Sequence, residues 1–247
     1  MYGYGYGYNL ARQSIGASED TFHPLDLADS QLYFAKNTAT PSLWNDQSLN
    51  GYDLTQATAT QQPTISANSV DFNGVDDFLN RNISLFGSDT EGIIYFASYV
   101  TSGVASFLGH TSAFHISNSN FIYCDYSSDN VRLIVRKTDF SVNNVIITDD
   151  TFPTGYIYGY VKASNGSYEI FVNGSIRTFT VNSGSNDGAW YDSIETCTKL
   201  SIGALNRQSP VYRVCSVNKS YYNNQPSLLS TSDLTKLNTF FSDPNNY

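Results

Sequence analysis

The loop of residues 183–192 (SGSNDGAWYD) gathers the side chains in this chain that are best suited to hold a sugar. A sugar site pairs an aromatic ring, which packs on the apolar face of the sugar, with a few polar groups that bond its hydroxyls. Asn186, Asp187, Trp190 and Tyr191 supply this mixture. Two alternatives follow: either Trp190 is exposed and contacts a glycan, or the loop folds Trp190 back onto the core.

A second group of chemically useful side chains is the acidic pair Asp76 and Asp77, which follows the turn dipeptide Asn73-Gly74. Paired carboxylates suit calcium, whereas aspartate beside a turn bonds main-chain amides. The chain has no EF-hand-like or repeated acidic loop. We therefore expect this pair to shape the turn, keep calcium as the alternative, and expect no other metal or cofactor.

Catalytic groups are scarce. Glycoside hydrolysis needs two carboxylates about 5 to 9.5 Å apart, and the chain has only four glutamates: Glu19, Glu91, Glu169 and Glu195. His110 and His115 are five positions apart, so on one continuous strand they would project to opposite faces. No nucleophile elbow is present. We expect the protein not to be an enzyme.

The N-terminal segment is built differently from the rest of the chain. Tyr2, Tyr4, Tyr6 and Tyr8 alternate with glycine, and residues 1–30 show no sustained hydrophobic period. If the segment is held extended, alternate residues place all four phenols on one face. It is either a flexible tail without a role or an arm that orders when it meets a partner.

Composition excludes several classes of function. Charged residues make up 14% of the chain and the net charge is -9, which disfavours binding to nucleic acid phosphates or anionic membranes. No apolar run is long enough for a transmembrane helix. The N-terminus lacks the basic start and apolar region of a Sec signal, so we expect export, if any, inside a particle. The sparse set Cys124, Cys197 and Cys215 predicts reduced, structural thiols.

From residue 31 onward, short apolar runs alternate with turn residues, as in a β-sandwich. In residues 156–181, the dipeptides Asn165-Gly166 and Asn173-Gly174 separate three alternating strands, which predicts a three-stranded meander. One helix is expected near the end, capped by Ser230, Thr231 or Ser232 and stopped by Pro244. We expect this helix on a sheet edge or on the rim of the sandwich.

Three segments in order resemble the laminin G-like branch of the concanavalin A-like lectin and glucanase superfamily. They are residues 43–79 (with WNDQS and VDFNGVDDFL), residues 168–174 (YEIFVNG), and residues 200–203 (LSIG) with the strand and helix that follow. The resemblance implies an all-β jelly-roll sandwich of two antiparallel sheets over residues 31–247, with one short C-terminal helix and an extended N-terminal arm. The chain departs from the family at residues 211–216, which lack a glutamate, and it lacks the carboxylate pattern of the related glucanases.

A lectin-like sandwich, an aromatic arm and no secretory signal are together typical of a phage virion protein. We expect a capsid-decoration, fibre or tail-associated structural protein that is made in the host cytoplasm. Its arm would bind other virion proteins, and its loops would attach to glycans on the host surface. The alternatives are a secreted or cell-surface carbohydrate-binding module and a cement protein without a ligand. A homo-oligomer is also expected.

Overall fold

The structure is a computed structural model that describes residues 22–82, 88–100, 106–112, 121–136, 143–194, 199–205, 211–212 and 214–247. The tyrosines of the arm, Tyr2, Tyr4, Tyr6 and Tyr8, lie outside the described residues, and so do Glu19, Glu195, His115 and Cys197. Of the expected arm, residues 22–30 are described. Phe22 packs edge-on against Phe240, with ring centroids 6.2 Å apart, so the packed part of the chain begins before residue 31.

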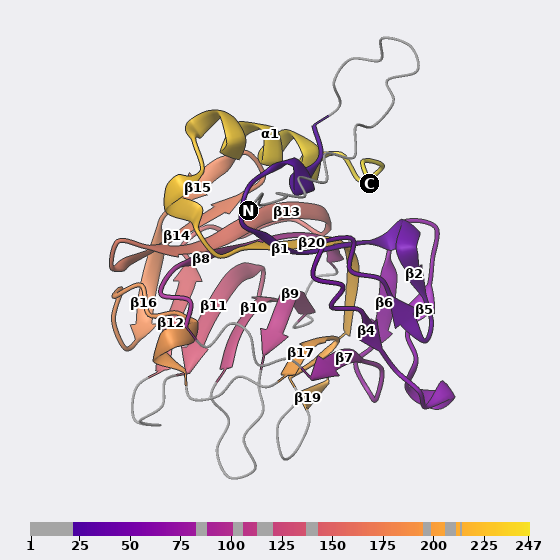
Figure 1. Cartoon of the computed structure of the whole chain (residues 1–247). Helices are drawn as coiled ribbons and strands as arrows, with labels where there is room; N and C mark the ends of the chain where they lie inside the picture. The colour runs from indigo at the N-terminus through magenta and orange to yellow at the C-terminus, as the bar shows by residue number, and fades with distance from the viewer. Residues whose placement is uncertain are drawn as a thin grey trace, which may run out of the picture.

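The strands form two antiparallel sheets, one above the other (Figure 1). Sheet A contains β1 (Ser30–Ala35), β5 (Thr64–Ile65), β6 (Val70–Asn73), β8 (Gly92–Val100), β13 (Gly155–Ser164), β14 (Ser167–Val172), β15 (Ser175–Arg177) and β20 (Val214–Asn223). Sheet B contains β2 (Ala39–Thr40), β3 (Leu43–Trp44), β4 (Leu54–Thr55), β7 (Leu79–Asn82), β9 (Ser106–Ser112), β10 (Phe121–Ser127), β11 (Asn130–Arg136), β12 (Asn143–Thr148), β16 (Phe179–Ser183) and β17 (Lys199–Ile202). A separate pair joins β18 (Ala204–Leu205) to β19 (Val211–Tyr212). The predicted sandwich is confirmed.

The main core lies between the two sheets, because each strand sends alternate side chains inward. Along β11, Val131, Leu133 and Val135 are fully buried in this core, while Arg132 and Arg136 alternate with them and are partly exposed. A strand of this pattern fixes its own register, since a shift by one residue would bury both arginines.

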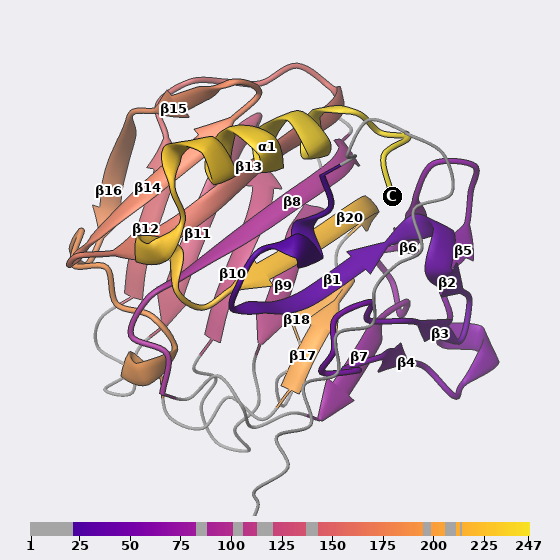
Figure 2. The same ribbon diagram turned by 45° about the horizontal axis from the view of Figure 1, so that its top comes forward.

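The C-terminal helix α1 (Thr231–Ser242) begins with a capping box between Ser230 and Asp233. It lies across the outer face of sheet A, over β13 and β8, as Figure 2 shows. Leu237, Phe240 and Phe241 form a second apolar cluster there with the tyrosines of the sheet. The prediction that the helix docks on an edge or rim was therefore wrong: the outer face of sheet A is itself apolar and needs a cover.

The Trp44-Asn45-Asp46-Gln47-Ser48 turn covers the free edge of β1. Asp46 accepts the main-chain N–H of Tyr33 at 2.9 Å, and the indole of Trp44 donates to the carbonyl of Ala35 at 2.8 Å. The N–H of Gln47 donates to the carbonyl of Tyr33 at 2.9 Å. An uncovered edge strand invites pairing with other chains, so this motif protects the sheet.

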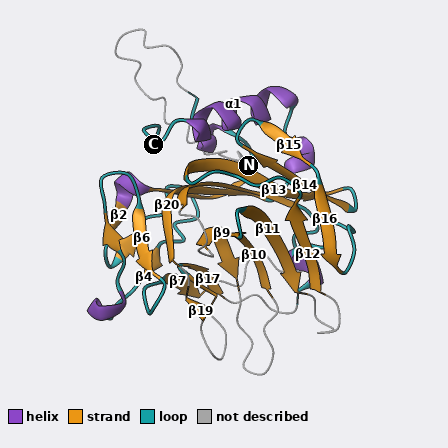
Figure 3. Ribbon diagram, turned by 180° about the vertical axis from the view of Figure 1, so that it is seen from behind, coloured by secondary structure: helices purple, strands orange, loops and turns teal. Residues whose placement is uncertain are grey.

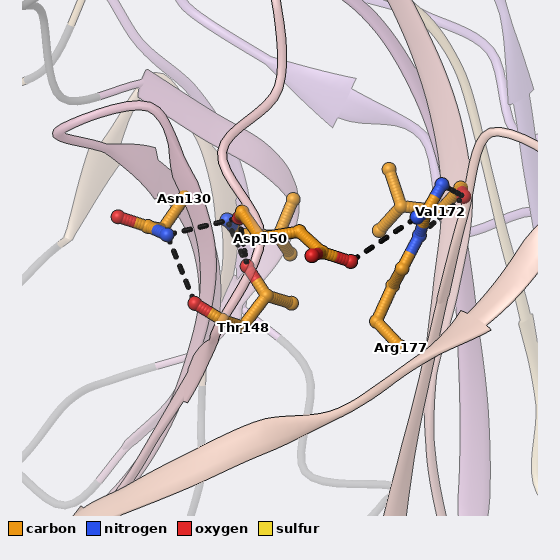
Figure 4. Close-up of polar contacts among 6 residues, drawn as sticks. Asn130, Thr148, Asp150, Val172 and Arg177 are labelled. Atoms are coloured by element: carbon orange, nitrogen blue, oxygen red, sulfur yellow. Dashed lines mark hydrogen bonds and ion pairs between the residues drawn. The ribbon is translucent and has the colours of Figure 1, made fainter.

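Both hairpins of the predicted meander are present, and their turn residues Asn165, Gly166, Asn173 and Gly174 all have positive φ. Its third strand is shorter than predicted. The chain leaves sheet A after Arg177, and β16 pairs with β12 in sheet B. Figure 4 shows how the crossing is held: Arg177 donates to the carbonyl of Val172 at 2.9 Å and pairs with Asp150 at 3.2 Å.

No helix among the described residues is long and apolar enough to cross a membrane. Cys124 and Cys215 are buried. Burial raises the pKa of the Cys124 thiol well above its ordinary value, so this thiol is unreactive at neutral pH.

Candidate functional site

The loop proposed from the sequence to hold a sugar folds onto the core. Trp190 and Tyr191 have no exposed surface, and their rings pack edge to face. The indole of Trp190 donates to the hydroxyl of Tyr222 at 3.3 Å and fills the space beside Gly92, where an added Cβ would come within 2.2 Å of Nε1. Of the two alternatives, the structure corresponds to the one in which Trp190 belongs to the core.

The polar members of the same loop hold it in place. The side-chain oxygen of Asn186 accepts the N–H of Tyr168 at 2.7 Å. Asp187 accepts hydrogen bonds from Asn144 at 2.7 Å and from Ser185 at 2.8 Å. The four predicted contact residues therefore do not form one exposed surface, although glycan contact by Asn186 and Asp187 stays a prediction.

The acidic pair after β6 makes the turn contacts expected of it. Asp77 accepts a hydrogen bond from the main-chain N–H of Asn73 at 3.0 Å, and Asp76 accepts one from the side-chain amide of Asn73 at 2.9 Å. Burial, partly offset by the bond from Asn73, raises the pKa of Asp77. No group of three or more potential metal ligands occurs within the described ranges, and calcium stays an untested alternative.

The described glutamates are engaged in local contacts. Glu169 pairs with Lys162 at 2.7 Å and accepts a hydrogen bond from Tyr160 at 2.7 Å. Glu91 accepts a hydrogen bond from Ser227 at 2.5 Å. These contacts do not test the expectation that the protein is not an enzyme.

A different group of side chains stands out on the outer face of sheet B, which is turned away from sheet A and α1 (Figure 3). The register of β10 and β11 pairs Phe121 with Arg136, Tyr123 with Ile134, and Asp125 with Arg132. Residues paired across antiparallel strands project to the same side of a sheet. We call these six residues the arginine face.

One arginine of this face is neutralised. Arg132 donates from Nε and Nη2 to the two carboxylate oxygens of Asp125, at 2.8 and 2.5 Å. The side chain of Asp125 is 1% exposed and that of Arg132 is 25% exposed. The hydrogen bond to Asp125 raises the pKa of Arg132 despite its partial burial. This pair is therefore a fixed, internally satisfied part of the face.

The other arginine is not neutralised. Arg136 forms no ion pair with a carboxylate of the described residues, and its buried Nε has no hydrogen-bond partner. Its guanidinium carbon lies 5.9 Å from the centre of the Phe121 ring, and the Tyr123 ring follows 5.2 Å from that of Phe121. The face thus holds Arg136, which has no carboxylate partner among the described residues, beside the buried ring of Phe121 and the partly exposed ring of Tyr123.

Such an arrangement suits a ligand that carries a carboxylate on an apolar-faced ring. A guanidinium binds a carboxylate through two parallel N–H bonds, and aromatic rings pack on apolar surfaces of the ligand. Sequence reasoning did not select these residues. The available signal was the alternation in β11, Asn-Val-Arg-Leu-Ile-Val-Arg, in which two arginines share the face opposite the core.

No protein-family model matches the chain, and no curated protein matches its sequence. Its fold resembles solved structures. The CBM40 domain of the Ruminococcus gnavus IT-sialidase bound to α2,3-sialyllactose superposes with a TM-score of 0.52 at 14% identity, over 68% of this chain and 92% of that domain. The Trypanosoma rangeli sialidase in complex with sialic acid superposes with a TM-score of 0.64 at 11% identity, over 90% of this chain. This chain covers only 35% of that sialidase. At these identities the likeness supports the concanavalin A-like jelly-roll fold alone.

Proposed function

We propose that the protein is a non-enzymatic carbohydrate-binding module whose arginine face binds a glycan with an anionic, carboxylate-bearing sugar. The observation that carries the proposal is Arg136, a cation without a carboxylate partner among the described residues, set against the ring of Phe121, which in turn lies beside Tyr123. The chain has a net charge of -9, yet the buried Nε–H of Arg136 has no hydrogen-bond acceptor. A ligand that supplies this acceptor best explains the unpaired group.

The roles within the face follow from its geometry. Arg136 would bind the carboxylate, Tyr123 would pack on the apolar face of the sugar, and the Asp125–Arg132 pair would hold β10 and β11 in register beneath it. The module of R. gnavus, which has the same fold, was solved with a sialylated sugar bound. This precedent supports the ligand class.

Calorimetric titration of the intact chain with 3′-sialyllactose and with lactose tests the proposal. We expect binding of the sialylated sugar only, and we expect Arg136→Gln to weaken it at least tenfold, the loss of about 1.5–3 kcal/mol that a charge-assisted hydrogen bond contributes. The matched control is Lys36→Gln, which removes one positive charge from a turn between β1 and β2. Equal affinity for both sugars, or an unchanged affinity of Arg136→Gln, would exclude the proposed role of the face.

The setting of the module is a separate proposal. A phage particle, with the module on its capsid, fibre or tail, remains the setting that the sequence favours. A secreted or cell-surface module is the alternative, and the fold of the R. gnavus domain is consistent with it. A sedimentation assay of purified particles against free protein distinguishes the two settings.

A further inference from the structure

A cavity of about 630 Å³ lies between helix α1, the first described residues and the C-terminal tail. Helix α1 lies on the outer face of sheet A (Figure 2), so the cavity that α1 lines is separate from the arginine face, which belongs to sheet B. Its walls carry the aromatic rings of Phe22, His23, Phe240 and Tyr247. This volume falls in the range that holds a small ligand or a few side chains.

The cavity is lined by aromatic rings together with the polar side chains of Thr235, Thr239, Asn245 and Asn246. The ring of Phe240 lies 6.2 Å from that of Phe22 and 5.8 Å from that of His23, and both pairs meet edge to face. The ammonium group of Lys236 lies 5.9 Å from the Phe22 ring. No aspartate or glutamate is among the residues that line the cavity. Such walls favour further aromatic rings, which pack edge to face or under a cation.

A polar group without a partner lies next to these walls. The ring of Tyr33 is 5.0 Å from that of His23 and 6.0 Å from that of Phe240, and Tyr33 is completely buried. Its hydroxyl has no hydrogen-bond partner. A buried hydroxyl in this condition costs free energy, and Tyr33 itself is not among the residues that line the cavity.

The cavity is preformed, because side chains of sheet A hold the helix end and the tail that line it. The ammonium group of Lys219, which is fully buried, donates to the carbonyls of Asp243 and Asn246, each at 2.6 Å, and to that of Phe240 at 3.4 Å. Tyr156 donates to the carbonyl of Phe241 at 2.7 Å. These bonds hold the end of α1 and the tail against sheet A, so an occupant does not have to order them.

The chain itself carries a segment of matching chemistry close to this site. The described part of the chain begins at Phe22, in the wall of the cavity, and 21 residues precede it. Among them, residues 2–8 (YGYGYGY) alternate tyrosine with glycine. In an extended segment, alternate rings are about 6.4–6.8 Å apart on one face, close to the ring spacings of the cavity. Glycine leaves the opposite face without side chains, and each phenol brings a hydroxyl.

We propose that this cavity is the docking site of residues 2–8 of the same chain. The tether between Tyr8 and Phe22 is thirteen residues long, residues 9–21. A short flexible tether gives the attached segment a millimolar effective concentration. The chain's own segment therefore outcompetes that of a second copy at micromolar protein concentration. Docking places the tyrosine rings among Phe22, Phe240 and Tyr247.

Hydrogen exchange of the full chain tests this assignment. We expect the amides of residues 2–8 to exchange at least about tenfold more slowly than in an unstructured peptide. Thr239→Trp places a large ring into the cavity from an exposed position of α1 and should remove this protection. Ser232→Trp adds the same ring at an exposed position outside the cavity lining and should leave the protection unchanged.

A second variant removes the tyrosine rings of the proposed occupant and leaves the cavity unchanged. Replacing Tyr2, Tyr4, Tyr6 and Tyr8 by serine should abolish the protection of residues 2–8 and speed the exchange of residues 243–247. Exchange of residues 2–8 at the rate of a free peptide, or equal protection in the Thr239→Trp chain, would overturn the proposal. Protection that rises with protein concentration would also overturn it, because the occupant would then belong to a second copy.

Discussion

Arg132 and Asp125 face each other across β10 and β11 on the outer face of sheet B, joined by two hydrogen bonds of 2.8 and 2.5 Å. The aspartate is almost completely buried, and the arginine balances its charge. Arg136, four positions further along the same strand, has no such partner among the described residues. The contrast separates an arginine that builds the face from an arginine that is available to a ligand.

Asp125→Asn should destabilise the fold. Removing one partner of a buried ion pair leaves the other charge unpaired, and because Arg132 is a quarter exposed we expect a loss of about 1–3 kcal/mol in the free energy of unfolding. Urea unfolding measures it. Asp150→Asn is the control, since Asp150 is 53% exposed in its pair with Arg177, and should cost less than about 1 kcal/mol. Equal losses in the two variants would contradict this account.

Asp46→Ala should be among the most damaging polar substitutions. The carboxylate of Asp46 accepts hydrogen bonds from the N–H groups of Tyr33, Ser48 and Tyr52 and from the Ser48 hydroxyl. Leaving two or more buried donors without acceptors predicts a loss of about 2–4 kcal/mol. The partly exposed turn residue Asp76 is the control, and Asp76→Ala should change stability by less than about 1 kcal/mol. A loss below 1 kcal/mol for Asp46→Ala would show that the β1 edge does not need its cover.

Lys219 should make stability depend on pH in an unusual direction. Burial lowers its pKa from 10.5 to about 7, and the nearby Asp243 offsets only part of this shift. Between these two values the unfolded chain binds more protons than the folded chain, so the free energy of unfolding rises with pH, by about 2 kcal/mol from pH 7 to pH 9. Denaturant titrations at these two pH values measure the change.

Above about pH 10 the trend should reverse, because burial raises the pKa of Tyr33, Tyr156 and Tyr160, and the unfolded chain then loses phenol protons that the folded chain keeps. Lys219→Met should remove the rise between pH 7 and pH 9 and leave the decline above pH 10. A rise of equal size in Lys219→Met would mean that another group causes it.

Trp190→Phe tests whether Trp190 is a core residue or a ligand contact. The smaller ring leaves a gap beside Gly92 and loses the bond to Tyr222, so the free energy of unfolding should fall by about 1–3 kcal/mol. Glycan affinity, measured by calorimetry well below the melting temperature, should stay within twofold of the wild type. A strong loss of affinity at unchanged stability would restore Trp190 as a binding residue.

The sequence predicted the fold well where local chemistry decides it. The Asn-Gly dipeptides at 165–166 and 173–174 require positive φ, and both turns are present. The helix begins where Ser230 and Asp233 cap it and ends before Pro244. The strand pattern and the family resemblance together predicted the two-sheet jelly roll, since alternation within short strands is a local property.

Features that depend on tertiary packing were not predictable. Trp190 sits among polar loop residues, and its burial depends on Gly92 and Tyr222, which are far away in the sequence. β16 belongs to sheet B because residues 179–183 pair with β12, a strand that is distant in the sequence. The arginine face needs the register of β10 against β11 to be known before Phe121, Tyr123 and Arg136 are seen to share one side.

The most direct test of the central claim is to locate the bound sugar on the intact, isotope-labelled chain by nuclear magnetic resonance titration with 3′-sialyllactose. The account predicts that the largest saturable shifts fall on β10 and β11, with Tyr123 and Arg136 among them, and that lactose produces none. Shifts centred instead on residues 183–192 or on the cavity beside α1, with β10 and β11 unchanged, would contradict it.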